Sequence, residues 1–232
     1  MKAIGLLGGM SWESTQVYYR LINQFTAERL GGLHSARLWL HSVDFFEIER
    51  LQQRGDWATA GEMLAAAAQG LERAGADFIV LCTNTMHIVA AQIQQACSIP
   101  LLHIADATAE QIRRRGIATV GLLGTRFTME KDFYGGRLRE QHGVDVIVPP
   151  REARDEVHRV IYEELCLGRI VTSSRERYTQ VIDELIGRGA QGIIFGCTEI
   201  SLLVSEGASR VPVFDTTRIH AEIAVDRALA AA

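Results

Sequence analysis

Two of the four cysteines stand in the same local context. Cys82 follows the apolar run at 79–81 and precedes Thr83, and Cys197 follows a similar run and precedes Thr198. A thiol with an ordinary pKa of about 8.5 is already a few per cent thiolate at neutral pH, so cysteines can serve both as acid and as base. A pair on opposite faces of a carbon atom could remove a proton from one face and deliver one to the other. Such a two-base transfer inverts a stereocentre.

Polar groups suited to holding a carboxylate come directly after both cysteines. These residues are Thr83, Asn84, Thr85, Thr198 and Glu199. Their side chains, together with the free N–H groups at a helix start, could bind a carboxylate and stabilise the enolate-like charge that builds as an α-proton leaves. A helix N-terminus is also expected to stabilise the thiolate itself. Cys97 and Cys166 lack this context, and by themselves they are expected to be buried apolar residues.

An internal repeat places the two cysteines at equivalent positions. IGLLG at 4–8 returns as VGLLG at 120–124, and IVLCT at 79–83 returns with its cysteine and threonine at 197–198. The two offsets, 116 and 115 residues, are nearly equal. This period is far too long for a solenoid, so it predicts two similar α/β halves.

The repeat divides the chain into residues 1–115 and 116–232, and the C-terminal helix could pack back on the first half. The predicted architecture is α/β, with two similar doubly wound parallel-sheet domains related by a pseudo-twofold axis. Because ligands bind at the carboxyl ends of parallel strands, the active site is expected in the cleft between the domains, with Cys82 and Cys197 on opposite sides.

Apolar, β-branched runs alternate with segments of helical period. Six strands are predicted, at 3–7, 36–43, 77–81, 118–123, 144–148 and 192–195. Six helices are predicted, at 11–30, 58–74, 86–96, 128–141, 154–167 and 174–188. The apolar runs are continuous rather than alternating, which is typical of parallel strands covered on both faces. Ser11 is the expected cap of the first helix.

Charge and composition exclude several classes of protein. The 24 basic and 28 acidic residues give a net charge of −4, which provides no bulk basic field for nucleic acid or an anionic membrane surface. No apolar stretch is long enough to span a membrane. The cysteines form no CxxC pair and no metal-type spacing, so no metal is expected and the protein is assigned to the reducing cytoplasm.

Lysine is nearly absent, with only Lys2 and Lys131 in 232 residues. A pyridoxal-phosphate racemase needs a lysine for its Schiff base. Lys2 opens the first predicted strand and Lys131 lies between acidic residues on a predicted exposed helix, so neither suits that role. A mechanism without a cofactor is therefore favoured.

Two motifs resemble signatures of a known family. IVLCTNTMH at 79–87 and IIFGCTEI at 193–200 are similar to the two signatures of the cofactor-independent aspartate/glutamate racemases. The resemblance extends from GLLGGMSWEST at 5–15 to the segment 212–222. It is closest to the enterobacterial broad-specificity branch, also described as L-aspartate/glutamate-specific racemases. It implies a cofactor-free isomerase, acting on small amino acids, that is commonly a homodimer.

The resemblance also implies roles for individual residues. Cys82 and Cys197 would be the acid/base pair, Thr83, Asn84, Thr85 and Thr198 would bind the α-carboxylate, and Glu199 would lie beside the second cysteine. The remaining substrate-binding residues would be Met10, Gln52, Thr125 and Cys166.

The sequence departs from relatives restricted to aspartate at two positions. Those relatives would carry an arginine near Gln52 and a lysine where Cys166 stands. Both residues are uncharged here, although Arg50 and Arg54 are close in sequence. Tolerance of neutral side chains such as homoserine or methionine is therefore expected beside aspartate and glutamate.

Other functions remain open at this point. The same scaffold could support hydantoin racemisation, maleate isomerisation or arylmalonate decarboxylation, although decarboxylases are expected to keep only one of the two cysteines. A non-catalytic protein that binds a small acid, or a thiol redox protein using a Cys82–Cys197 disulfide, would share parts of the pattern.

Overall fold

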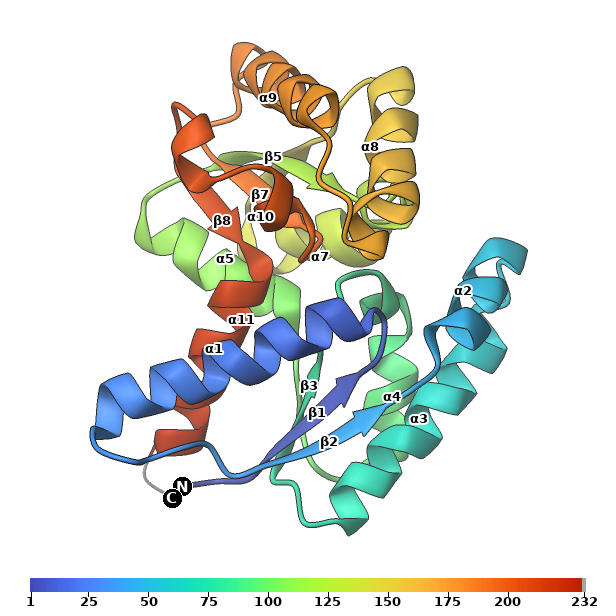
Figure 1. The fold of residues 1–232 in the computed structure, drawn as a ribbon, viewed down its shortest axis with the longest axis vertical. Helices are drawn as coiled ribbons and strands as arrows, with labels where there is room; N and C mark the ends of the chain where they lie inside the picture. Colours follow the sequence, from blue (N-terminus) through green and yellow to red (C-terminus); the bar gives the residue numbers. More distant parts are fainter. Residues whose placement is uncertain (231–232) are drawn as a thin grey trace. The chain divides into compact units, whose positions relative to one another are not determined.

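The computed structural model describes residues 1–230, which form two compact units (Figure 1). Unit 1 comprises Met1–Ile104 together with the C-terminal segment that begins at His220, and unit 2 comprises Ala105–Ile219. The chain therefore changes unit near the start of one helix, α5 (Ile104–Arg114), and again within α11 (Thr216–Leu229). These units differ from the repeat-based halves by the helix α5 and the last part of α11.

Unit 1 is built on a four-stranded parallel sheet. Its strands are β1 (Ile4–Gly8), β2 (Leu38–Ser42), β3 (Phe78–Leu81) and β4 (Leu101–Leu102). The order across the sheet is β2-β1-β3-β4, so the chain starts in the middle and winds outward on both sides.

Helices cover both faces of this sheet. They are α1 (Trp12–Leu30), α2 (Phe45–Arg54), α3 (Trp57–Arg73), the 3₁₀ helix η1 (Thr85–Val89), α4 (Ala90–Ala96) and α11. Side chains of β1 and β3 alternate between two hydrophobic clusters, one shared with α3 and α4 and the other with α1 and α11. In Figure 1, α1 and α3 lie on opposite sides of β1 and β3. The central strands are thus buried on both faces, as the sequence predicts.

The edge strand β2 behaves differently. Its residues Trp39 to Ser42 are exposed, although the continuous apolar pattern predicts a covered strand. β2 pairs only with β1 in the described part of the chain, so it lacks the neighbour that would bury its second edge. The prediction of complete coverage is wrong for this strand.

Unit 2 repeats the same winding. Its strands are β5 (Thr119–Gly124), β6 (Asp145–Ile147), β7 (Ile193–Gly196) and β8 (Val213–Asp215), in the order β6-β5-β7-β8. Its helical elements are α5, α6 (Arg126–Glu130), α7 (Asp132–His142), α8 (Arg151–Glu163), η2 (Leu165–Leu167), α9 (Thr172–Gly187), α10 (Ile200–Leu203) and η3 (Glu206–Ala208). Both sheets are parallel with equivalent strand orders, which confirms the doubly wound α/β class.

Several local features differ from the sequence-based elements. The helix predicted at 128–141 is two helices, α6 and α7, because Lys131 adopts an extended conformation with φ −92° and ψ 145°. The strands β4 and β8 span two and three residues, too few to give a period. The sequence pattern also does not predict the helix α2, because only two of its residues, Ile48 and Gln52, are buried.

The cap predicted at Ser11 is confirmed. Its side-chain oxygen accepts a hydrogen bond from the backbone N–H of Ser14, at 3.2 Å. This bond satisfies one of the N–H groups that a helix start leaves without an intrahelical partner. It fixes the turn between β1 and α1. This turn leads to Ser14, whose side chain bonds the Cys82 carbonyl.

Candidate active site

Cys82 lies at the carboxyl end of the central strand β3. Its backbone N–H donates to the carbonyl of Leu7 in β1 (2.9 Å), so the parallel pairing continues through the cysteine. The hydroxyl of Ser14, in the first turn of α1, donates to the Cys82 carbonyl (3.3 Å). These bonds hold the backbone of Cys82 against the end of β1 and the start of α1.

The surroundings of Cys82 favour the neutral thiol. Its side chain is fully buried among apolar residues of β1, β3, α1 and α11, and its Sγ lies 3.6 Å from the carbonyl oxygen of Val80, to which it donates. Burial raises the pKa of this thiol far above its usual range. Burial therefore outweighs any stabilisation of the thiolate that a helix start provides. The following helix, η1, is a single short 3₁₀ segment, and it does not offset the loss of hydration.

The predicted carboxylate ligands of unit 1 form the turn after Cys82. Thr83, Asn84 and Thr85 are all buried, and Thr85 opens η1. The carbonyl of Thr83 accepts a hydrogen bond from Nδ1 of His87 (2.8 Å), and the carbonyl of Asn84 accepts one from the His87 backbone N–H (3.1 Å). The turn is thus folded back on a buried histidine.

Gln52 reaches this turn from α2. Its amide nitrogen donates to Sδ of Met86 in η1 (3.1 Å), and both side chains are buried. Met10, buried in the turn after β1, belongs to the same hydrophobic cluster as Met86. Unit 1 therefore brings together Met10, Gln52 and the segment that follows Cys82.

The arginines near Gln52 do not share its environment. Arg50 and Arg54 are exposed, and the guanidinium of Arg50 lies 5.5 Å from the centre of the Phe46 ring. Helical residues two positions apart do not face each other, which explains why Gln52 is buried and its charged neighbours are not. The buried face of α2 is uncharged at this position.

Cys197 occupies the equivalent place in unit 2, directly after the central strand β7. Its Sγ donates to Oε2 of Glu199 (3.0 Å), and Sγ of Cys166, in η2, donates to Oε1 of the same carboxylate (3.8 Å). Glu199 is 96% buried, with a relative exposure of 4%. A single buried carboxylate therefore lies against two thiols that are 31 residues apart in the sequence.

The electrostatics around Cys197 favour the thiol over the thiolate. Burial contributes most, and the neighbouring charge of Glu199 and the Cys166 thiol add to it; together they raise the pKa of Cys197 well above its usual value. Because Glu199 accepts the hydrogen bond, the thiol proton already points at a group able to receive it. The thiol of Cys82 donates to the backbone carbonyl of Val80 instead of to a carboxylate, so the two thiols differ in their surroundings.

Threonines flank Cys197 on the same edge of the sheet. The hydroxyl of Thr217, at the start of α11, donates to the Thr198 hydroxyl (3.0 Å). Thr125 follows β5 and caps α6 by accepting from the N–H of Thr128 (3.2 Å). Gly124 and Gly196 are paired in the sheet, so Thr125 and Cys197 begin side by side at the carboxyl ends of β5 and β7.

Sequence reasoning missed three contributors to these turns. Ser14 bonds the Cys82 carbonyl, Thr217 bonds Thr198, and His87 bonds Thr83. His87 lies within the first signature, but its spacing indicates only an ordinary structural histidine. Within residues 1–230 there is no group of three or more His, Cys, Asp or Glu side chains that could hold a metal ion.

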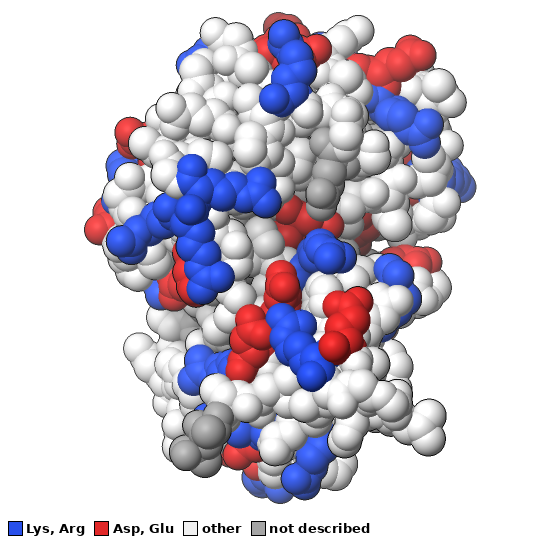
Figure 2. Space-filling model, turned by 90° about the vertical axis from the view of Figure 1, so that its left-hand side faces the viewer, with Lys and Arg blue, Asp and Glu red and all other residues white. Residues whose placement is uncertain are grey.

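The surface charge is mixed. Figure 2 shows basic and acidic side chains interspersed over the visible face. On unit 1, for example, Arg29 of α1 pairs with Asp226 (2.7 Å) and Glu222 (3.4 Å) of α11. No helix in the described part of the chain is long and apolar enough to cross a membrane.

Comparison with known proteins identifies the relatives of this chain. Residues 7–224 match the family model described as Asp/Glu/Hydantoin racemase. The broad specificity amino-acid racemase RacX of Bacillus subtilis (strain 168) is 26% identical over 236 residues, which cover 98% of each protein.

Two crystal structures are similar over nearly the whole chain. A Yersinia pestis protein assigned to the Asp/Glu racemases is 61% identical, with a TM-score of 0.93 and coverage of 99% of this chain and 100% of that one. PH1733 of Pyrococcus horikoshii OT3, an aspartate racemase homologue, is 36% identical, with a TM-score of 0.85 and coverage of 98% and 99%.

Removal of the Glu199 charge is expected to activate the Cys197 thiol towards alkylation. In Glu199→Gln the pKa of Cys197 falls, because an anion that disfavours the thiolate is lost while burial is kept. We expect iodoacetamide to label Cys197 several-fold faster at pH 8 than in the wild type, measured by peptide mass spectrometry. Cys82 in the same sample is the internal control and should keep its rate. Unchanged or slower labelling of Cys197 would show that the Glu199 carboxylate does not raise the pKa of the Cys197 thiol.

Proposed function

The chain belongs to the Asp/Glu/hydantoin racemase family and is an isomerase, and from that premise we propose that it racemises amino acids with Cys82 and Cys197 as its two bases. The observation that carries the proposal is the equivalence of the two cysteines. Each follows the central strand of its own sheet, β3 or β7, and each is followed by threonine. A reaction that must run in both directions needs one acid and one base of the same kind, one for each face of the substrate carbon.

The proposed reaction transfers two protons and uses no cofactor. One cysteine thiolate takes the α-proton: the Cα–H bond breaks, an S–H bond forms, and the electron pair spreads onto the substrate carboxylate. The opposite thiol then gives its proton to the other face of Cα, so that a new Cα–H bond forms and this sulfur becomes the thiolate. The enzyme is returned with the roles of the cysteines exchanged, ready for the reverse direction.

Substrate binding is proposed to supply the positive charge that favours a thiolate. Burial favours the neutral thiol at both cysteines. The α-ammonium group of an amino acid brings a positive charge that favours a nearby thiolate. At Cys197 the leaving proton can pass to Glu199, whose Oε2 lies 3.0 Å from Sγ. We assign Glu199 the role of proton acceptor that generates the Cys197 thiolate.

The polar groups beside the cysteines are assigned to the substrate carboxylate. Thr83, Asn84 and Thr85 are buried in the turn after Cys82, and Thr198 follows Cys197. Donors held in place by a folded turn stabilise developing charge at no reorganisation cost during the reaction. The same groups would hold the carboxylate as it takes up the electron pair from Cα. Met10 and Thr125 are assigned to the walls of the site.

Aspartate and glutamate are the proposed substrates, together with neutral amino acids such as homoserine and methionine. The uncharged side chains at Gln52 and Cys166 support this breadth, since neither offers a cation to a distal carboxylate. Arg50 and Arg54 are exposed, while Gln52 is buried. Hydantoin racemisation is the alternative reaction of the same family, and it is separated by including a 5-substituted hydantoin among the substrates tested.

Chiral chromatography of a panel of L-amino acids tests the proposal. Racemisation by the purified protein, without added cofactor, is expected to fall at least about 1,000-fold in Cys82→Ser and in Cys197→Ser, because each serine is a much weaker acid and base. Cys97→Ser is the matched control and should keep wild-type activity. A wild-type protein inactive on the whole panel, or a Cys→Ser variant that still racemises at the wild-type rate, contradicts the proposal.

The same panel tests side-chain breadth. We expect kcat/KM for L-homoserine to lie within about tenfold of that for L-aspartate, a difference of about 1.4 kcal/mol. Gln52→Arg should shift the preference towards L-aspartate at least tenfold, because it adds a cation on the buried face of α2. Gln53→Arg, on the exposed side of the same helix, is the control and should leave the preference unchanged. A wild-type preference for the acidic pair of more than 100-fold would refute the proposed breadth.

A homodimer in the reducing cytoplasm is the proposed state of the protein. All four cysteines are free, and the mechanism requires Cys82 and Cys197 to stay reduced. Large apolar side chains are exposed on unit 1, namely Trp12, Tyr19, Leu33, Trp39 and Phe46. Light scattering should give twice the chain mass of 25.7 kDa. A monomer mass across micromolar concentrations rules the dimer out.

A further inference from the structure

Three histidines, two buried and one half-buried, lie close together in unit 1 near the turn that carries Cys82. The rings of His87 and His103 have centroids 4.6 Å apart, and those of His87 and His220 are 5.9 Å apart. His87 and His220 have relative exposures of 2% and 0%. None of the three is used in the proposed reaction. Two of them make hydrogen bonds that fix their protonation state and their tautomer.

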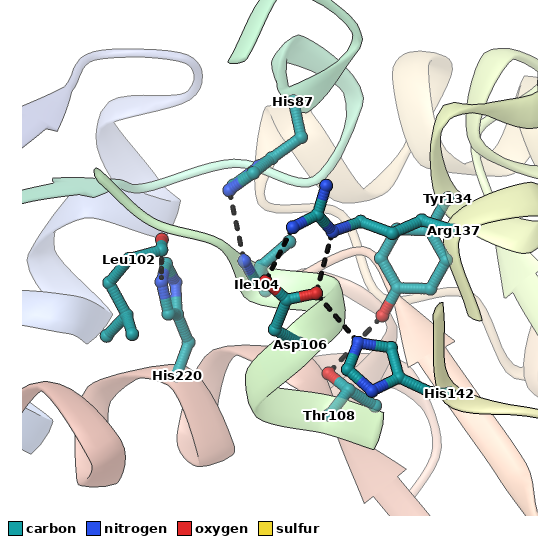
Figure 3. A network of polar contacts seen from close by, with 9 residues as sticks. All are labelled: His87, Leu102, Ile104, Asp106, Thr108, Tyr134, Arg137, His142 and His220. Carbon is teal, nitrogen blue, oxygen red and sulfur yellow. Dashed lines mark hydrogen bonds and ion pairs between the residues drawn. The ribbon is translucent and has the colours of Figure 1, made fainter. Parts of the chain in front are cut away.

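His87 bridges two neighbouring strand ends. Its Nδ1 lies 2.8 Å from the Thr83 carbonyl, and its Nε2 accepts a hydrogen bond of 3.2 Å from the backbone N–H of Ile104 (Figure 3). Thr83 follows β3, and Ile104 follows the adjacent strand β4 and opens α5. The imidazole therefore ties the Cys82 turn to the next turn along the carboxyl edge of the sheet.

The donor and acceptor roles admit one tautomer. The backbone N–H of Ile104 can only donate, so Nε2 of His87 must carry a lone pair. The Thr83 carbonyl can only accept, so Nδ1 must carry the hydrogen. A doubly protonated ring would lose the bond to Ile104 and would place a positive charge at the N-terminus of α5, where cations are disfavoured. Burial, with the neighbouring His103 and His220, lowers the pKa of His87 well below its usual value, which agrees with a neutral ring.

The backbone N–H of Ile104, to which His87 bonds, lies at the start of a helix. The Ile104 N–H is one of the groups that the start of α5 leaves without an intrahelical partner, and His87 satisfies it. Two residues further along α5, Asp106 accepts two hydrogen bonds from Arg137 of α7 (2.6 and 2.7 Å) and one of 2.9 Å from His142 (Figure 3). His87 is thus bonded to the first residue of α5.

His220 performs a different task with the opposite tautomer. Its Nε2–H donates to the Leu102 carbonyl (2.9 Å), and its Nδ1 accepts from the Tyr18 hydroxyl (2.9 Å). Burial lowers the pKa of His220 to about 4. These bonds join α11, β4 and α1, and none of them reaches the Cys82 turn. His220 therefore provides a control of similar burial and chemistry.

We infer that His87 is a positioning residue for the reaction: as a neutral Nδ1–H imidazole it holds the Thr83 carbonyl, and with it the orientation of Cys82 and of the carboxylate-binding groups at 83–85. The inference rests on the proposed racemase function. A displacement of about 1 Å at a reacting group can cost about 100-fold in rate, so loss of this bridge should act on kcat. His87 would do so without touching the substrate.

Variants that keep or remove the bridge test the inference. We expect His87→Phe to lower kcat for racemisation about 10- to 100-fold, with a smaller change in KM, because the ring volume is kept and both hydrogen bonds are lost. His87→Gln has one amide donor and one amide acceptor, and it should restore kcat to within about threefold of the wild type. His220→Phe should lower the Tm yet leave kcat within about twofold. A His87→Phe enzyme with wild-type kcat and only a lower Tm, or a His87→Gln enzyme as slow as His87→Phe, overturns the inference.

A measurement on the wild-type protein covers the case in which His87→Phe does not fold. Nitrogen-15 NMR of histidine-labelled protein at pH 7 should give a protonated Nδ1 and an unprotonated Nε2 for His87, and the reverse for His220. A protonated Nε2 at His87 overturns the inference. Because the tautomer is read without substrate, this result is independent of the proposed function, which fails separately when the wild-type protein racemises no amino acid.

Discussion

Parallel pairing of the central strands is the constraint that positions Cys82 in unit 1 and Cys197 in unit 2, each with the polar turn that follows it. In unit 1 the register of β1 with β3 continues into the bond between the Cys82 N–H and the Leu7 carbonyl, and in unit 2 Gly124 pairs with Gly196, directly before Cys197. Because all strands of a parallel sheet end at the same edge, the polar turns that follow them are collected there. The glycines are part of this arrangement. A Cβ atom on Gly196 would lie 3.0 Å from the Leu123 carbonyl oxygen, tighter than an ordinary van der Waals contact, so the paired strand would have to shift.

The surroundings of Cys82 and Cys197 share a topology but differ in their electrostatics. Cys82 is surrounded by apolar side chains, and the turn that follows it is bonded to the buried His87. Cys197 lies against a buried carboxylate that is also in contact with Cys166. Burial raises the pKa of both thiols, and the Cys197 thiol donates to a carboxylate whereas the Cys82 thiol donates to a backbone carbonyl. In the proposed reaction, the ammonium charge of the substrate favours the thiolate, which links substrate recognition to activation of the base.

Much of this organisation is readable in the sequence, for identifiable reasons. The repeat of IGLLG and of the Cys-Thr pair predicts two equivalent sheets, because equal spacing of strand ends reflects equal winding. The Ser11 cap follows from local chemistry. The features that were missed depend on long-range contacts. The thiol pKa depends on burial by α1 and α11, the bond between Cys166 and Glu199 spans 33 residues, and the bridge from His87 reaches Ile104, which lies in another turn. For the edge strand β2, the sequence predicts burial that the structure does not show. Apolar composition alone does not reveal that a strand has only one neighbouring strand.

The central claim is that two cysteines act on opposite faces of one carbon atom, and solvent deuterium incorporation at low conversion tests it most directly. The wild-type protein would be incubated with an L-amino acid in heavy water, and the D-product and the remaining L-substrate would be separated and analysed for deuterium at Cα. We expect the D-product to carry one deuterium from the first turnovers while the remaining L-substrate carries almost none, because the proton removed by one cysteine is not the one delivered by the other. A D-product that retains the original proton, or deuterium appearing equally fast in the unreacted L-substrate, would contradict the two-base arrangement.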